Sequence, residues 1–99
     1  MSAQDEETHG TVSRTVKIVN QRGLHARASA KFVQTASQFT SRITVEKDGL
    51  EVGGSSIMGL MMLAASPGCM IQITATGSDA NQAMVALEEL VSGRFGEEA

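Results

Sequence analysis

Segments in which apolar and polar residues alternate predict four β-strands in this chain. A period of two is typical of a strand that buries one face. The strands are expected at residues 15–20, 41–47, 50–52 and 69–76. Asp48 and Gly49 separate the middle two strands and indicate a tight hairpin turn.

Between the strands, apolar residues recur every three or four positions, which predicts amphipathic helices. The helices are expected at residues 26–38, 55–65 and 80–92. Ser55 or Ser56 is positioned to cap the second helix, and Gly93 to end the third. The predicted order of elements is therefore β-α-β-β-α-β-α.

This order predicts an α+β fold. Because strands with one apolar face need a single cover, all three helices should lie on one side of a mostly antiparallel, four-stranded sheet. A chain of 99 residues is long enough for one domain. We expect that domain to span residues 13–93, between a flexible N-terminal tail (1–12) and a short C-terminal tail (94–99) to which no function is assigned.

Composition and charge argue against several classes of function. The net charge of −3 and the three aromatic residues argue against nucleic-acid binding. No apolar run is long enough for membrane insertion, and the acidic, polar N-terminus is unlike a secretory signal. The single cysteine, Cys69, cannot form an internal disulfide and is expected to be a reduced, buried thiol. We therefore expect a cytoplasmic protein, and nothing indicates a cofactor.

Residues 23–29, "GLHARAS", place a histidine at the predicted start of the first helix. A helix start carries free backbone N–H groups and the positive end of the helix dipole, which favour the neutral, nucleophilic imidazole of His25. The N–H groups of Ala26 and Arg27 can bind a phosphoryl group on that ring, and the Arg27 side chain can add a charge-assisted hydrogen bond. Gly23 allows the chain to turn sharply before the helix. The combination suits a transient phosphohistidine.

Local sequence alone leaves other interpretations of His25 open. A lone histidine at this place can also be a cap or an ordinary surface residue. A metal site would need further ligands at suitable spacing, and His9 and Cys69 do not supply them. A Ser-His-Asp site would need a nucleophilic serine and an orienting acid, and nothing marks either. No metal site is expected.

The second predicted helix, "SSIMGLMML", is apolar nearly all the way round. Leu60 and Leu63 can enter the core, which would leave Ile57, Met58 and Met61 exposed as an adaptable surface for partners. A wholly buried helix is the alternative from the pattern. Ser56 at the helix start is either a plain cap or a place where an added phosphate would be tolerated.

Taken together, "GLHARAS" and "SSIMGLMML" resemble the active-site signature and the regulatory-serine motif of the histidine phosphocarrier protein family, HPr, of the bacterial phosphoenolpyruvate-dependent phosphotransferase system. The spacing of the two motifs and the element order match as well, and the resemblance covers about residues 14–92. It implies an open-faced β-sandwich. Ala28 stands where many members have proline, and Ser55 where many have lysine.

The resemblance also implies roles for particular residues. His25 would accept the phosphoryl group on Nδ1, and Arg27 would assist the transfer. Ser56 matches the serine that HPr kinase/phosphorylase modifies in many bacteria. The surface that docks enzyme I and the enzyme IIA proteins would include Ile57, Met58 and Met61.

The implied protein is a monomeric phosphoryl carrier and not an enzyme with its own turnover. It would serve sugar uptake, nitrogen-related regulation, or both, and "SSIMGLMMLAASPG" is similar to proteobacterial carriers of the nitrogen-related branch. The alternative of a different class is a small α+β ligand-sensing or protein-interaction domain without covalent chemistry.

Overall fold

The strands form one antiparallel sheet in the order β1-β4-β2-β3. The structure is a computed structural model that describes residues 10–97. The strands are β1 (Thr11–Lys17), β2 (Arg42–Lys47), β3 (Leu50–Gly53) and β4 (Met70–Thr76). The helices are α2 (Ala26–Ala36), α3 (Ile57–Met62) and α4 (Ala80–Ser92), followed by the short 3-10 helix η1 (Arg94–Gly96).

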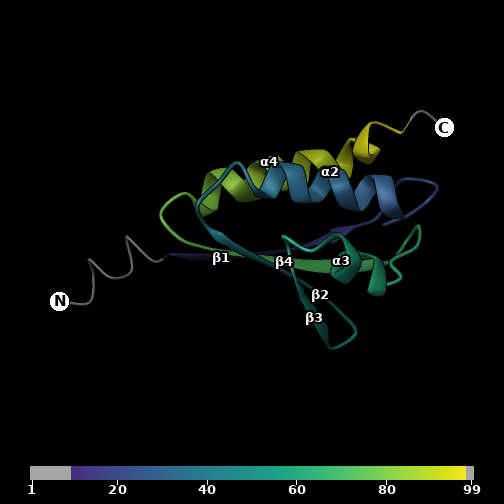
Figure 1. Ribbon diagram of the computed structural model, residues 1–99, viewed down its shortest axis with the longest axis horizontal. Coiled ribbons are helices and arrows are strands. Elements are labelled where there is room, and N and C mark those ends of the chain that lie inside the picture. The colour runs from purple at the N-terminus through teal and green to yellow at the C-terminus, as the bar shows by residue number, and fades with distance from the viewer. Residues whose placement is uncertain (1–9, 98–99) are drawn as a thin grey trace.

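The helices cover one face of the sheet, as Figure 1 shows for α2 and α4. Helix α2 packs against both α3 and α4. This arrangement confirms the predicted α+β open-faced sandwich and its β-α-β-β-α-β-α order. The uncovered face carries exposed side chains of β4 such as Met70 and Gln72.

The core lies between the helices and the sheet and follows the predicted apolar positions. On β4 the residues facing the helices are Ile71, Ile73 and Ala75, all of which are buried. The stripe predicted on the last helix is also inward, and its buried members are Ala80, Ala83, Met84, Leu87 and Val91. Asp79, just before α4, accepts hydrogen bonds from the backbone N–H groups of Thr40 and Ser41, which fixes the loop that enters β2.

The first strand differs from the prediction at both ends. It was expected at residues 15–20, but β1 covers Thr11–Lys17, so residues 11 and 12 belong to the sheet and not to the predicted N-terminal tail. The edge position of β1 explains the difference, because several residues of this strand are exposed and the alternation is weak. Strand β1 is held by its pairing with β4, which includes a hydrogen bond between the hydroxyl groups of Ser13 and Thr74. The remainder of the predicted tail, residues 1–9, lies outside the described residues.

The second helix is shorter than predicted. Residues 55–65 were expected to be helical, whereas α3 covers only Ile57–Met62. Ser56 is its N-cap, and the hydroxyl of Ser56 accepts a hydrogen bond from the N–H of Gly59 at 2.9 Å. The helix ends early because Ala64 adopts a left-handed conformation with φ of 52°. Similarly, α2 ends at Ala36, two residues before the expected end.

The predicted C-terminal tail is wrong for residues 94–97. These residues fold back onto the domain, and Phe95 is buried with the core residues. The Nζ atom of Lys31 on α2 donates a hydrogen bond to the carbonyl of Phe95 at 2.8 Å. The segment is therefore part of the domain.

Cys69 is not the fully buried thiol that the pattern predicted. It lies just before β4 and is half-buried, and its sulfur is 3.4 Å from the hydroxyl of Ser66. That hydrogen bond is the main reason that the pKa of Cys69 is lowered from its ordinary value. Within residues 10–97, no helix has the length and apolar character that crossing a membrane requires.

A tight turn before α2 brings two distant loops together. Gly23 has φ of 64°, and a Cβ at this position would overlap the carbonyl oxygen of Ala65. The N–H of the next residue, Leu24, donates a hydrogen bond to the same carbonyl at 2.9 Å. Only glycine fits here, because both the conformation and the space exclude a side chain.

We expect Gly23→Ala to lower the free energy of unfolding by about 2–4 kcal/mol, through a left-handed alanine and the overlap with Ala65. Gly49→Ala is the matched control, since Gly49 also has a positive φ but open space around it. Gly49→Ala should lower the free energy of unfolding by only about 1–2 kcal/mol. Urea unfolding of both variants measures the difference, and equal losses would show that the contact with Ala65 is unimportant.

Candidate functional site

His25 occupies the N-cap of α2, as predicted. Its backbone is extended (φ −76°, ψ −176°), and its carbonyl accepts the first helical hydrogen bond from the N–H of Ser29 at 2.9 Å. The His25 side chain makes no capping hydrogen bond and is 23% exposed. The first N–H groups of a helix have no partner within the helix, so those of Ala26 and Arg27 are donors next to the imidazole.

The residues on either side of His25 are fixed by the core. Leu24 is buried, and its carbonyl accepts a hydrogen bond from the hydroxyl of Ser29, which is also buried. Gly23 sets the turn before them. The imidazole is therefore presented at the surface from a backbone that cannot easily shift.

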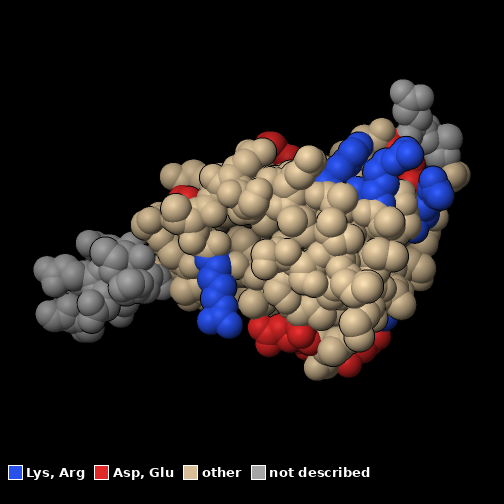
Figure 2. All heavy atoms as spheres, viewed as in Figure 1, with Lys and Arg blue, Asp and Glu red and all other residues tan. Residues whose placement is uncertain are grey.

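Three basic side chains line the small hollow at His25. Arg22, Arg27 and Lys31 contribute to the lining of this hollow, which has a volume of about 60 Å³. Figure 2 shows basic side chains gathered at the end of the molecule where the described chain ends. Sequence reasoning found Arg27 but missed the other two. The signal for Lys31 was its place four residues after Arg27, one helical turn away on the same face.

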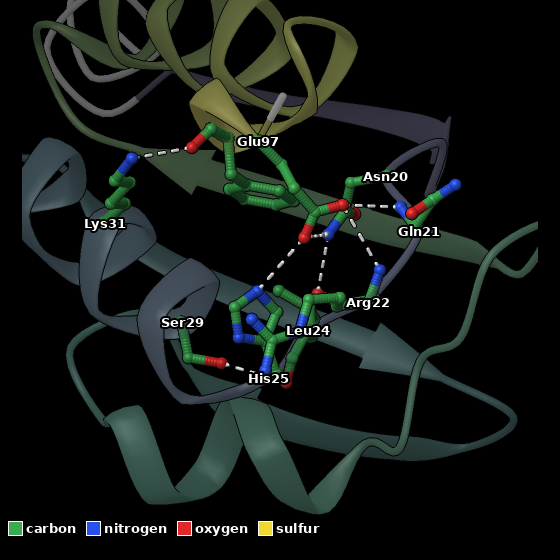
Figure 3. Close-up of polar contacts among 10 residues, drawn as sticks. Asn20, Gln21, Arg22, Leu24, His25, Ser29, Lys31 and Glu97 are labelled. Carbon is green, nitrogen blue, oxygen red and sulfur yellow. Dashed lines mark hydrogen bonds and ion pairs between the residues drawn. The ribbon is translucent and has the colours of Figure 1, made fainter. Parts of the chain in front are cut away.

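Glu97 is an acidic residue of this site, and sequence reasoning missed it. The Oε1 atom of Glu97 accepts hydrogen bonds from the N–H groups of Gln21 (2.6 Å) and Arg22 (3.3 Å). Its Oε2 atom accepts one from the Nδ2 of Asn20 (3.5 Å) and lies 3.5 Å from the Nε2 of His25. These contacts are drawn in Figure 3, where the carboxylate lies between the imidazole and the loop before α2.

The environment of Glu97 favours its charged form. Burial of the carboxyl acts against ionisation, but the hydrogen bonds from Gln21, Asn20 and Arg22, together with the charge of a protonated His25, outweigh it. The pKa of Glu97 is therefore lowered from its ordinary value of 4.5. One signal could have indicated that this segment is ordered, because Phe95 extends the apolar stripe of α4 four residues beyond Val91.

Helix α3 presents an apolar surface beside α2. Leu60 and Leu63 are buried as expected, whereas Ile57 and Met61 are about two-fifths exposed and Met58 is 71% exposed. Met62, which the sequence argument did not single out, is also exposed. Because α2 packs on α3, this surface adjoins the helix that carries His25. The alternative prediction, in which this helix is wholly buried, is therefore wrong.

No group of three or more His, Cys, Asp or Glu side chains within residues 10–97 is arranged to hold a metal ion. His9, considered as a ligand from the sequence, lies outside that range.

Comparisons with known proteins connect this geometry to a family. A family model described as "PTS HPr component phosphorylation site" matches residues 12–93. The phosphocarrier protein HPr of Neisseria meningitidis serogroup A is 52% identical over 86 residues, which cover 87% of this chain and 97% of that protein.

Solved structures of similar proteins share the fold. The crystal structure of HPr-C-His from Thermoanaerobacter tengcongensis has a TM-score of 0.85 and 48% identity, and the match covers 89% of this chain and 99% of that one. The crystal structure of HPr from Bacillus anthracis has a TM-score of 0.79 and 46% identity, covering 83% and 98% of the two chains.

The open-faced sandwich and the family match define a phosphoryl-carrier protein, which relays a phosphoryl group and is not a catalytic enzyme. The chain belongs to the HPr family of the phosphoenolpyruvate-dependent phosphotransferase system. This membership implies enzyme I and enzyme IIA proteins as partners. It decides against the alternative of a ligand-sensing or interaction domain without covalent chemistry.

The contacts of Glu97 predict a pH-dependent contribution to stability. The folded pKa is lower than the unfolded one, so the contribution is complete above the unfolded pKa and is lost as the pH falls through the folded pKa. Glu97→Gln should therefore be less stable than the wild type near neutrality, and the difference should shrink as the pH falls toward the folded pKa of Glu97. Urea unfolding from about pH 7 to about pH 3 measures this difference.

Glu51→Gln, at an exposed position of β3, is the control for this series and should change stability little at any pH. A stability difference for Glu97→Gln that does not vary with pH would contradict the explanation.

Proposed function

We propose that His25 is the phosphoryl acceptor of this carrier, that it receives the group on Nδ1 from phospho-enzyme I, and that it passes the group to enzyme IIA proteins. The observation that carries the proposal is the partly exposed imidazole at the N-cap of α2, beside Arg22, Arg27 and Lys31. A helix start and adjacent cations are a favourable environment for a phosphoryl group. The family to which the chain belongs carries its phosphate on a histidine.

The transfer step places the new bond at the start of α2. The lone pair of Nδ1 forms a bond to phosphorus while the bond from phosphorus to the donor group of enzyme I breaks, and that electron pair stays with the donor. The backbone N–H groups of Ala26 and Arg27 and the Arg27 guanidinium stabilise the charge spread over the three phosphoryl oxygens. The acceptor is held by its backbone, so little reorganisation is needed during transfer.

The exposed surface formed by Ile57, Met58 and Met61 is the proposed docking surface for enzyme I and enzyme IIA proteins. It is apolar, adjoins the helix of His25 and consists largely of adaptable methionine side chains. Ser56 at its edge is the proposed site of regulatory phosphorylation by an HPr kinase/phosphorylase. The hydroxyl of Ser56 lies at the exposed start of α3, where helix geometry tolerates an anion.

The proposed carrier acts as a monomer in the cytoplasm. The sugar-uptake and nitrogen-related branches differ in the enzyme IIA protein that receives the phosphoryl group. Incubation with phosphoenolpyruvate and host extract, with wild type and a His25 variant side by side, identifies that acceptor by its dependence on His25.

His25→Ala should abolish phosphorylation by enzyme I and phosphoenolpyruvate. Because the imidazole is partly exposed and makes no capping hydrogen bond, the variant should keep its fold. Loss of acid-labile, base-stable phosphate, with an unchanged circular dichroism spectrum, is the expected result. His9→Ala, at the other histidine of the chain, is the control and should be phosphorylated normally. Normal phosphorylation of the His25 variant would refute the assignment.

Arg27→Ala should slow transfer from phospho-enzyme I by about tenfold to hundredfold, because it removes a charge-assisted contact worth roughly 1.5–3 kcal/mol. Arg27→Lys should recover only part of the rate, since an ammonium cannot form the planar, two-pronged contact of a guanidinium. Stopped-flow transfer assays measure these rates. Arg14→Ala on β1 is the control, and equal rates for all four proteins would remove Arg27 from the mechanism.

Ser56→Asp should weaken binding to enzyme I about tenfold or more without destabilising the domain. The added charge lies at the edge of the docking surface. Like charges that face one another across an interface with a partner cost free energy. Aspartate is itself a good N-cap, so the free energy of unfolding should change by less than about 0.5 kcal/mol.

Phosphorylation of Ser56 adds more charge than Asp and should act in the same direction more strongly. Binding and melting curves for wild type, Ser56→Ala and Ser56→Asp check this. Ser78→Asp, which adds the same charge in the exposed loop before α4, is the control. Unchanged affinity, or a loss of affinity that follows a collapsed melting temperature, would contradict the proposal.

A further inference from the structure

We propose that Glu97 positions the imidazole of His25 for phosphoryl transfer, by holding the neutral ring in the form that carries its proton on Nε2 and leaves Nδ1 free. This inference rests on the proposed function, in which His25 is the acceptor. Glu97 acts here as a positioning residue and does not itself touch the phosphoryl group.

The first support is that the segment carrying Glu97 is held in place. After α4 the chain turns through three consecutive residues with positive φ, namely Arg94, Phe95 and Gly96. Phe95 is buried in the core, and its carbonyl is bound to the Nζ of Lys31 on α2. The backbone next to Glu97 is thereby tied to the helix that His25 caps.

The second support is that the carboxylate of Glu97 is fixed by the loop before α2. One oxygen accepts from the N–H groups of Gln21 and Arg22, and the other accepts from the Nδ2 of Asn20. Asn20 is fully buried, and its Nδ2 also donates to the carbonyl of Gly23 at 2.9 Å. Because both neighbours of this atom are acceptors, only the amino end of the Asn20 amide fits there.

The third support is the side of the ring that faces Glu97. The Oε2 atom lies 3.5 Å from Nε2, the nitrogen opposite the proposed acceptor. In Figure 3 the dashed line from Glu97 reaches one edge of the ring of His25. Since the carboxylate is bound to the loop and not to the N–H groups of Ala26 and Arg27, it leaves the start of α2 open to a phosphoryl group.

The chemistry of Glu97 and His25 then specifies which ring nitrogen of His25 carries the proton. A carboxylate can only accept hydrogen bonds, and a neutral imidazole carries one N–H. A proton on Nε2 facing Glu97 means that Nδ1 holds a free lone pair, which is the atom that must attack phosphorus. When the Nδ1–P bond forms, Nε2 keeps its proton and the ring becomes positively charged. The carboxylate stabilises that charge, as the acid of a catalytic triad does for its histidine.

Glu97→Gln tests this inference because it keeps the shape of the side chain and removes its charge. A glutamine can present either its oxygen or its amino group to Nε2, so it no longer specifies the tautomer. NMR of protein with isotope-labelled histidine, at a pH where the ring is neutral, should show a shift from the Nε2–H form toward the Nδ1–H form. Glu97→Asp, which keeps the charge on a shorter side chain, should lie between Gln and wild type.

The kinetic result expected for Glu97→Gln is a maximal transfer rate from phospho-enzyme I about tenfold lower, with an unchanged KM for the carrier. The KM should not change because Glu97 lies outside the docking surface on α3. Glu51→Gln is the matched control and should alter neither the tautomer nor the rate. If the role of Glu97 were merely structural, Glu97→Gln would lower the melting temperature without changing the tautomer equilibrium of His25.

The outcomes separate this inference from the proposed function. If the wild type is phosphorylated on His25 but Glu97→Gln keeps the wild-type tautomer, or transfers at the wild-type rate or faster, the positioning role is refuted. If His25→Ala is still phosphorylated, the acceptor assignment itself fails. If Glu97→Gln does not fold, Glu97→Asp decides. The shorter side chain of aspartate holds its carboxylate farther from Nε2, so a tautomer and a transfer rate equal to those of the wild type would refute the proposed control of the ring by a carboxylate at this distance.

Discussion

The contact between the loop before α2 and the loop after α3 determines where His25 lies. The N–H of Leu24 is bonded to the carbonyl of Ala65, and the two backbones are so close that Gly23 has no room for a side chain. Because Leu24 is buried and the next residue is the helix cap, the imidazole takes its position directly from this contact. The same contact ties His25 to the segment after α3, and it thereby connects the proposed acceptor to the proposed docking surface.

Glu97 and three basic side chains line the same small hollow as His25. The carboxylate of Glu97 lies on the Nε2 side, where N–H groups of the preceding loop bind it and lower its pKa. Glu97 does not bind the N–H groups at the start of α2, which remain as donors. We propose that a phosphoryl group, which brings about two negative charges, binds at this helix start without displacing Glu97. A small protein can build such a site because only three parts of the chain surround the imidazole of His25. They are helix α2, the loop before it and the segment after α4 that carries Glu97.

The sequence predicted the fold and the place of His25 at the start of a helix well, because both depend on local patterns. The stripe from Ala80 to Val91 and the alternation in β4 were reliable since each buries one face. The edge strand β1 was placed too late because it is held by pairing with β4 more than by burial. The place of Glu97 beside His25 could not be predicted, since it depends on three positive φ angles that return the chain to a loop more than seventy residues earlier.

The proposed function requires that the start of α2 receive a phosphoryl group on the Nδ1 atom of His25. NMR of the phosphorylated protein tests it most directly, because coupling between phosphorus and a ring nitrogen identifies the bonded atom. We expect coupling to Nδ1 of His25, together with shifts of the backbone N–H signals of Ala26 and Arg27 as they bind the phosphoryl oxygens. Coupling to Nε2, or phosphate on any other residue after reaction with enzyme I, would contradict it.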